Sequence, residues 1–133
     1  MPLENIKRKA QAALNALDCP EGELSIVIAD DPQIQELNRE YLHRDKPTNV
    51  MAFPMLEGDF PDITPSLLGD VVISVETADK EARDGDMTFM ERFDQLLIHG
   101  ILHLFGYDHE QDEEEAVEME EKAVELLSRI SGM

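Results

Sequence analysis

The sequence is short of several residue types, and each shortage excludes a class of protein. Cys19 is the only cysteine among 133 residues, so no intramolecular disulfide can form, and we expect a structural role for it in a reducing compartment. No apolar run approaches the roughly 20 residues that a transmembrane helix needs. The N-terminal stretch mixes charged and apolar residues at helical spacing, unlike a signal peptide. We therefore predict a cytoplasmic protein with no membrane partner.

Positive charge is also scarce, since 11 Lys and Arg face 30 Asp and Glu, for a formal net charge of -19. A field of this sign favours solubility and opposes non-specific binding to nucleic acid, so DNA is not an expected partner. The charges are unevenly distributed, because ten acidic residues lie between Asp108 and Glu125 and six basic residues lie within the first 46 positions. A locally basic surface is compatible with this distribution.

The pattern of apolar residues and turn residues predicts a single α+β domain over residues 1–133. Helical spacing is expected over residues 3–17, 31–42, 76–84 and 89–104, and from about 112 to 130. Short apolar or β-branched runs predict strands over residues 23–29, 49–53 and 67–75. The resulting order is helix, strand, helix, strand, strand, helix, helix, helix.

Three of these helices begin with capping signals. Asp31 is the expected N-cap of the second helix, and Pro32 suits its first turn. Capping boxes are expected at the last two helices, and the residue pairs are Thr88 with Glu91 and Asp112 with Glu115.

Histidine is rare, yet three of the four histidines lie in one stretch, HGILHLFGYDH, from His99 to His109. Residues four apart on a helix share a face, so His99 and His103 can direct both imidazoles to one point. Gly106 can end the helix in a left-handed conformation and bring His109 round to the pair. This spacing predicts a three-histidine metal site.

Three imidazoles with no nearby cysteine suit Zn²⁺ with an open fourth position, while nickel, copper and manganese are not excluded by ligand type. The alternative is that the histidines are ordinary polar residues at a helix C-terminus, where the helix dipole favours a cation. That alternative accounts for one histidine and leaves the spacing of the other two unexplained.

The spacing HxxxHxxGxxH is that of the metzincin proteases, but Gly100 stands where those enzymes carry a glutamate base. Without that carboxylate, peptide hydrolysis by the protease route is disfavoured. We expect Gly100 to leave space beside the metal for a bulky anionic substrate such as a phosphodiester.

The histidine stretch resembles the bacterial YbeY family of metal-dependent endoribonucleases, as do three further stretches in the same order. These stretches are LNREY at 37–41, DKPTNVMAFP at 45–54 and LGDVVIS at 68–74. The resemblance implies a zincin-like α+β fold, in which a small mixed sheet packs with helices and the metal-binding helix ends in a glycine turn. It also implies one zinc ion held by His99, His103 and His109.

The activity that the resemblance implies is cleavage of single-stranded RNA. The family is associated with 3′-end maturation of small-subunit ribosomal RNA and with ribosome quality control. Ribosomal RNA and ribosomal or ribosome-assembly proteins are therefore the implied partners. The family usually carries an arginine where this sequence has Leu42, and Arg44 or Arg39 is the candidate replacement.

Three further residues are candidates for the site. Arg44 or Lys46 is expected to neutralise charge on the scissile phosphate, although basic residues in a loop are often only solvated. Asp108 is a candidate to orient a histidine or to accept a proton, or else it caps the turn.

Two other functions remain open from the residues alone. The first is a metallopeptidase that takes its base from elsewhere, for example Asp108 or Asp70. The second is a non-catalytic, zinc-stabilised module of ribosome assembly, which needs a fourth protein ligand such as Cys19 or His43.

Overall fold

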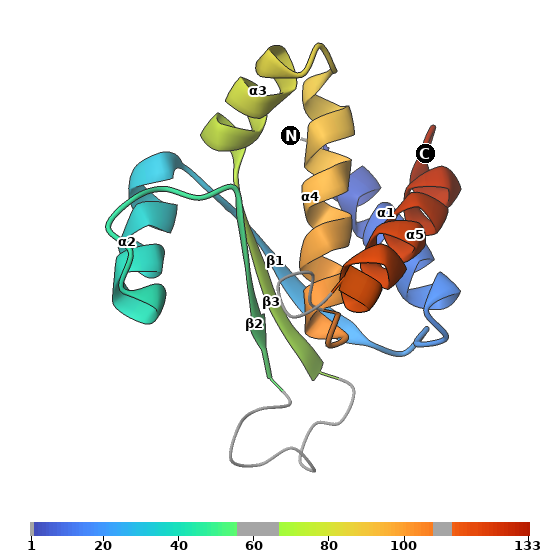
Figure 1. Ribbon diagram of the computed structural model, residues 1–133. Coiled ribbons are helices and arrows are strands. Elements are labelled where there is room, and N and C mark those ends of the chain that lie inside the picture. Colours follow the sequence, from blue (N-terminus) through green and yellow to red (C-terminus); the bar gives the residue numbers. More distant parts are fainter. Residues whose placement is uncertain (1, 56–66, 108–112) are drawn as a thin grey trace.

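The computed structural model describes residues 2–55, 67–107 and 113–133, and its elements follow in the predicted order (Figure 1). The helices are α1 (Leu3–Ala16), α2 (Asp31–Leu42), α3 (Val75–Asp84), α4 (Phe89–Leu104) and α5 (Glu113–Ile130). The strands are β1 (Glu23–Ala29), β2 (Val50–Pro54) and β3 (Leu67–Ser74). The predicted α+β class is therefore confirmed. No helix in this part of the chain is long and apolar enough to cross a membrane.

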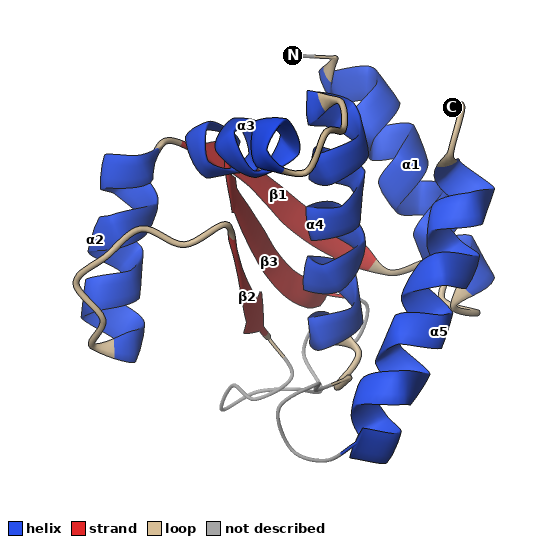
Figure 2. Cartoon of the chain, turned by 45° about the horizontal axis from the view of Figure 1, so that its top comes forward, coloured by secondary structure: helices blue, strands red, loops and turns tan. Residues whose placement is uncertain are grey.

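The three strands form one mixed sheet in the order β1-β3-β2. The central strand β3 pairs in parallel with β1 and antiparallel with β2. β2 is therefore an edge strand, and α4 packs across one face of the sheet over β2 and β3 (Figure 2).

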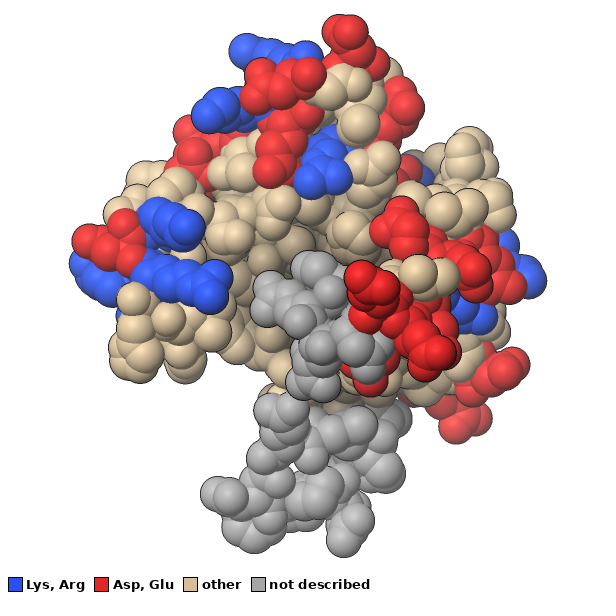
Figure 3. Space-filling view, viewed as in Figure 1, with Lys and Arg blue, Asp and Glu red and all other residues tan. Residues whose placement is uncertain are grey.

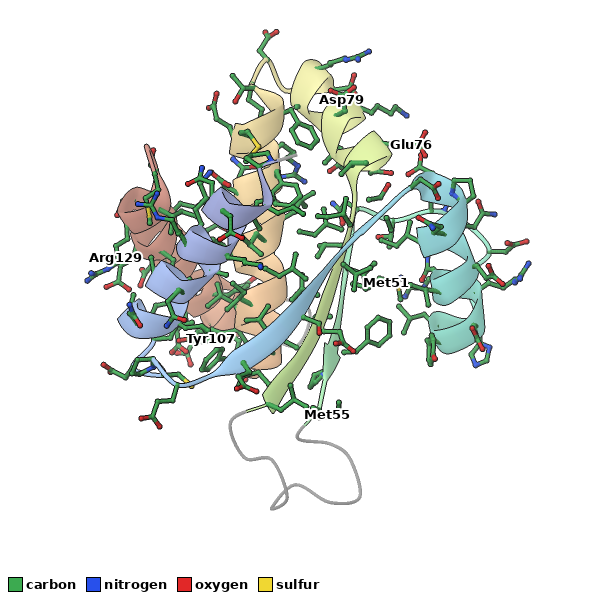
Figure 4. All side chains as sticks on the ribbon, turned by 180° about the vertical axis from the view of Figure 1, so that it is seen from behind. Met51, Met55, Glu76, Asp79, Tyr107 and Arg129 are labelled. Atoms are coloured by element: carbon green, nitrogen blue, oxygen red, sulfur yellow. The ribbon has the colours of Figure 1, made fainter. Side chains whose placement is uncertain are left out.

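Helices cover both faces of the sheet. Because successive side chains of a strand point to opposite faces, β3 contributes residues to two separate cores. The larger core joins α1, α4 and α5 to one face, which includes Val71 and Ile73 of β3. The smaller core joins α2 to the other face through Ile34, Met51 and Val72. Figure 4 shows Met51 between the sheet and α2.

The N-cap of α2 lies one residue before the predicted one. Asp30, with an extended backbone, accepts a hydrogen bond from Gln33 N at 2.9 Å, and Gln33 Oε1 accepts one from Asp30 N at 3.0 Å. The prediction of Asp31 was wrong because its carboxylate has another task. It accepts hydrogen bonds from Ser74 Oγ and Thr77 Oγ1 at 2.6 and 2.5 Å, which ties α2 to the start of α3.

The capping box at α4 is confirmed. Glu91 N donates to Thr88 Oγ1, and Thr88 N donates to Glu91 Oε1, both at 3.1 Å. The box predicted at Asp112 lies outside the described residues. α4 is the helix that carries His99 and His103, and its start is thus fixed by local sequence.

An ion pair that is mostly shielded from solvent links α4 to α1. Lys9 Nζ lies 3.1 and 3.0 Å from the two carboxylate oxygens of Asp94, and the two side chains are only 5% and 13% exposed. Burial raises the pKa of Asp94, and the nearby Lys9 ammonium opposes that shift.

Candidate metal centre and substrate surface

The candidate site begins with a polar face on α4. Its residues recur at intervals of three or four, so they share one side of the helix, and all are half-buried; they are Arg92, Gln95, His99 and His103. The opposite sides of α4 carry the apolar residues of the core. The histidine pair therefore lies on a side of the helix whose residues are not part of the hydrophobic core.

His99 and His103 lie together as the spacing predicts. The third expected ligand, His109, and the candidate base, Asp108, both lie outside the described residues. Within residues 2–55, 67–107 and 113–133, no three His, Cys, Asp or Glu side chains are grouped to hold a metal ion. The described residues therefore contain two of the three predicted ligands, and the three-histidine site stays a prediction.

Gly106 ends the helix as predicted. Its φ of +91° is one that L residues rarely adopt. Gly106 N donates to His103 O and Tyr107 N donates to Leu102 O, both at 3.1 Å, which is the hydrogen-bond pattern of a Schellman turn. Figure 4 shows Tyr107 at this end of α4. The chain thus turns out of the helix three residues after His103, and three residues before His109.

Gly100 does not leave open space, and that expectation was wrong. The residue is buried, and a Cβ atom on it would stand 2.5 Å from Cγ1 of Val71 and 3.3 Å from Cγ2 of Val50. The missing side chain is what lets α4 approach the sheet. A glutamate side chain at this position would collide with β3, so a protease base is excluded here more firmly than by sequence alone.

A second polar cluster, not anticipated from the sequence, secures the start of the polar face. Arg92 Nε donates to Glu81 Oε1 at 3.0 Å, and Asn49 Nδ2 donates to the same carboxylate at 3.2 and 3.3 Å. Arg92 also donates to Gln95 at 2.7 Å. The cluster joins the start of β2, α3 and α4, and it neutralises Arg92. Since Asn49 and Glu81 are 32 residues apart, no local signal could reveal it.

The basic candidates lie around the end of α2, which packs on the opposite face of the sheet from α4. Arg39, Arg44 and Lys46 are exposed, and none of them pairs with an acidic side chain in the described part of the chain. Arg44 N donates to Asn38 O at 3.3 Å, and Asn38 Nδ2 donates to Lys46 O at 2.9 Å. The buried Asn38 therefore fixes the loop that carries both cations.

Leu42 occupies the last position of α2 and is 54% exposed. At the position where the resemblance leads us to expect an arginine, the side chain is thus apolar and exposed to solvent. Arg39 and Arg44 both lie within three residues of it, and both are exposed.

The charges on this face are segregated. In Figure 3, Lys and Arg side chains gather over α2, and acidic side chains gather over the first turn of α5, where Glu113, Glu114 and Glu115 are consecutive. A pocket of about 310 Å³ beside that turn is lined by Phe105, Gly106, Tyr107, Glu115 and Glu118. An anionic substrate is therefore attracted to the α2 side and repelled from the α5 side.

The alternative donors are poorly placed. Asp70 precedes Val71 in β3, and Val71 faces α4, so Asp70 points to the opposite face of the sheet from the histidine pair. Cys19 follows α1 and packs against the larger core, whereas His43 ends α2 on the other side of the sheet. These two residues lie in different layers of the fold.

The fold and the histidine helix define a class of α+β protein in which a mixed three-stranded sheet supports two histidines on a helix ended by glycine. Comparison with known proteins is more specific. Residues 2–131 match the family model described as Endoribonuclease YbeY, and the chain belongs to this family.

Individual relatives agree with this assignment. The chain is 50% identical to an Endoribonuclease YbeY of Syntrophotalea carbinolica, over 96% of this chain and 86% of the relative. It is 49% identical to one of Geobacter metallireducens, over 92% and 83%. The solution structure of TM1509 from Thermotoga maritima matches with a TM-score of 0.71 and 30% identity, over 98% of this chain and 81% of that protein.

Proposed function

We propose that the protein is a zinc-dependent endoribonuclease that cleaves single-stranded RNA in the cytoplasm. The observation that carries the proposal is the pair His99 and His103 on one polar face of α4, directly before the Schellman turn, in a chain of the Endoribonuclease YbeY family. The proposed process is 3′-end maturation of small-subunit ribosomal RNA and ribosome quality control, with ribosomal or ribosome-assembly proteins as partners.

The residues present fit a zinc ion. His99 and His103 offer two imidazole donors from one helix face, and the chain turns at Gly106 so that His109 follows within six residues of His103. An all-nitrogen donor set with no thiolate suits a catalytic rather than a closed structural site. When bound, zinc supplies the Lewis acidity that polarises a phosphoryl oxygen and lowers the pKa of water.

The chain's own residues would bind and orient the substrate. Arg44 or Lys46 contacts a backbone phosphate of the bound RNA on the α2 side of the sheet, because these cations are exposed and have no acidic partner among the described residues. Asp108 remains the candidate for holding a histidine or accepting a proton. The acidic first turn of α5 repels the RNA backbone, and this repulsion favours approach over α2.

The outer edge of β2 offers few backbone N–H groups to a peptide substrate. Extended peptides bind sheet edges through backbone hydrogen bonds, so such an edge is a poor peptide-binding site. Ser74 N donates to Asn49 O, and Met55 N donates to Leu68 O. The backbone N–H and C=O groups of Asn49 and Met55 therefore point towards β3. In an antiparallel pair the direction alternates, so the backbone groups of residues 50, 52 and 54 point away from the sheet. Val50 N already donates to the Asn49 side chain at 2.7 Å.

Residue 54 is a proline, which has no N–H group. Ala52 is thus the only residue of β2 with an outward N–H still available to a peptide. Together with Gly100, which lacks the protease base, this edge favours phosphodiester over peptide hydrolysis.

The proposal is tested with the full chain and three substrates. These are a single-stranded RNA spanning the 3′ end of small-subunit ribosomal RNA, the same RNA in a duplex, and a peptide library. We expect cleavage of the single strand alone, lost on chelation and restored by zinc. Cleavage of peptides instead, or RNA cleavage that chelation leaves unchanged, would contradict the proposal.

A further inference from the structure

Tyr41 is an unusually exposed aromatic residue beside the β2 edge. Its side chain lies in the last turn of α2, with 57% of the residue exposed. Burying an aromatic ring is ordinarily favourable, so an exposed ring with a fixed position needs an explanation. Tyr41 contacts Phe53 of β2 edge to face, with ring centroids 5.2 Å apart and planes inclined at 65°.

Phe53 holds Tyr41 in place without covering it. Phe53 is half-buried against the smaller core, which also contains Ile34 and Met51. In an edge-to-face pair, one ring meets the other with its edge, so a large part of the Tyr41 ring remains in solvent. A ring fixed in this way loses little conformational freedom when a flat ligand stacks on it.

Cations lie in the segment that follows the ring directly. His43 adopts a left-handed φ of 59° and ends α2, and Arg44 and Lys46 follow. The buried Asn38 binds this loop through its own carbonyl and through its side-chain amide. The exposed ring and two cations that have no acidic partner among the described residues are therefore held within six residues of one another.

This combination fits single-stranded nucleic acid. Such ligands are bound by aromatic side chains on which bases stack, beside cations that contact the backbone. A duplex keeps its bases stacked inside, so it offers no base face to Tyr41. A purely apolar protein partner would leave Arg44 and Lys46 without counter-charge.

We infer that Tyr41 is a base-stacking platform: one base of a single-stranded RNA stacks on its ring while an adjacent phosphate contacts Arg44 or Lys46. The inference rests on the proposed function for the identity of the ligand. It adds a contact that distinguishes single-stranded from double-stranded RNA. This contact lies by α2, on the opposite face of the sheet from α4 and the histidine pair.

Binding is measured with a labelled 12-nucleotide oligouridylate by fluorescence anisotropy, in full-length His103→Ala protein so that the RNA stays intact. Tyr41→Leu is expected to weaken binding about tenfold, because stacking on one aromatic side chain typically contributes this much or more. Tyr41→Phe keeps the ring and is expected to bind as the parent does. Leu3→Ala, which truncates a similarly exposed side chain on α1, is the matched control and is expected to change nothing.

A second arm changes the RNA and leaves Tyr41 intact. A single abasic nucleotide is moved along the oligonucleotide, and at one position we expect a loss of affinity equal to that of Tyr41→Leu. With that RNA, Tyr41→Leu should cause no further loss. Equal binding by Tyr41→Leu and its parent, an equal loss in Tyr41→Phe, or no sensitive abasic position would overturn the inference.

The two proposals fail separately. If wild-type protein cleaves RNA in a zinc-dependent manner while Tyr41→Leu leaves affinity and KM unchanged, the platform is refuted and the endoribonuclease proposal stands. If Tyr41 and the abasic position show the expected coupling but no RNA is cleaved, the platform stands and the catalytic proposal fails. Absence of any RNA binding refutes the platform.

Discussion

A Cβ atom at Gly100 would stand 2.5 Å from Cγ1 of Val71, so the helix that carries the histidines touches the central strand with no room for a side chain. Val71 is β-branched and fully buried, and its methyl groups cannot move aside without repacking the core.

We therefore expect Gly100→Ala to lower the free energy of unfolding by about 1–3 kcal/mol through overpacking, partly offset by the better helix propensity of alanine. Val71→Ala should relieve the collision. In the double variant, the cost of Gly100→Ala is expected to shrink by about 1 kcal/mol or more, as measured by urea unfolding. Additive effects would show that the contact does not limit packing.

Removing one charge of the Lys9–Asp94 pair is expected to lower the free energy of unfolding more than removing both charges. Lys9→Met leaves a carboxylate buried without its partner and is expected to cost roughly 3 kcal/mol of unfolding free energy. Lys9→Met combined with Asp94→Leu removes both charges and is expected to recover most of that loss. A double variant less stable than Lys9→Met would contradict this account.

The same pair gives a pH dependence. Burial raises the pKa of Asp94 above its usual 3.8, so the native state binds this proton more tightly than the unfolded state. The resulting stabilisation is fully present below pH 3.8 and is lost as pH rises through the raised pKa. We expect wild-type stability to fall relative to Asp94→Asn over that interval, in unfolding measured at a series of pH values.

Gly106 gives a prediction that separates backbone strain from packing. Apart from its two chain neighbours, no described residue has an atom within 4 Å of a Cβ added at this position, so Gly106→Ala is expected to meet mainly the cost of its positive φ, about 1–2 kcal/mol. The strain should also displace the residues that follow. We expect weaker zinc binding in Gly106→Ala and a smaller effect in Gly106→Asn, since asparagine adopts positive φ more readily. Calorimetric zinc titration of the three proteins distinguishes these outcomes.

Arg44 and Lys46 should contribute charge without sequence preference. Each alanine substitution is expected to weaken binding of single-stranded RNA and to reduce the dependence of affinity on salt concentration by about one counterion. Arg8→Ala removes an exposed cation from α1, and is the matched control. An equal reduction in Arg8→Ala would mean that net charge alone attracts the RNA.

Local features of the sequence were sufficient for much of the fold. The Thr88–Glu91 box and the turn at Gly106 are defined by residues a few positions apart, so both ends of α4 could be placed. The pairing of His99 with His103 follows from helix geometry in the same way. Their partner His109 lies outside the described residues, and its role stays a prediction.

Features that depend on distant residues were missed or misjudged. Gly100 was expected to border open space because nothing near it in the chain indicates that Val71 fills that side. The sequence around Asp31 is typical of a helix cap. Its actual partners, Ser74 and Thr77, lie more than 40 positions away, so nothing near Asp31 in the chain indicates them. The cluster of Asn49, Glu81 and Arg92 depends on three elements meeting in space.

We propose that His99 and His103 belong to a zinc site on which RNA cleavage depends. The most direct measurement is zinc content per chain, together with cleavage of single-stranded RNA, in wild type, His103→Ala and His43→Ala. We predict about one zinc and full cleavage in wild type and in His43→Ala, and loss of both in a folded His103→Ala protein. RNA cleavage that persists in folded, zinc-free His103→Ala would contradict the account.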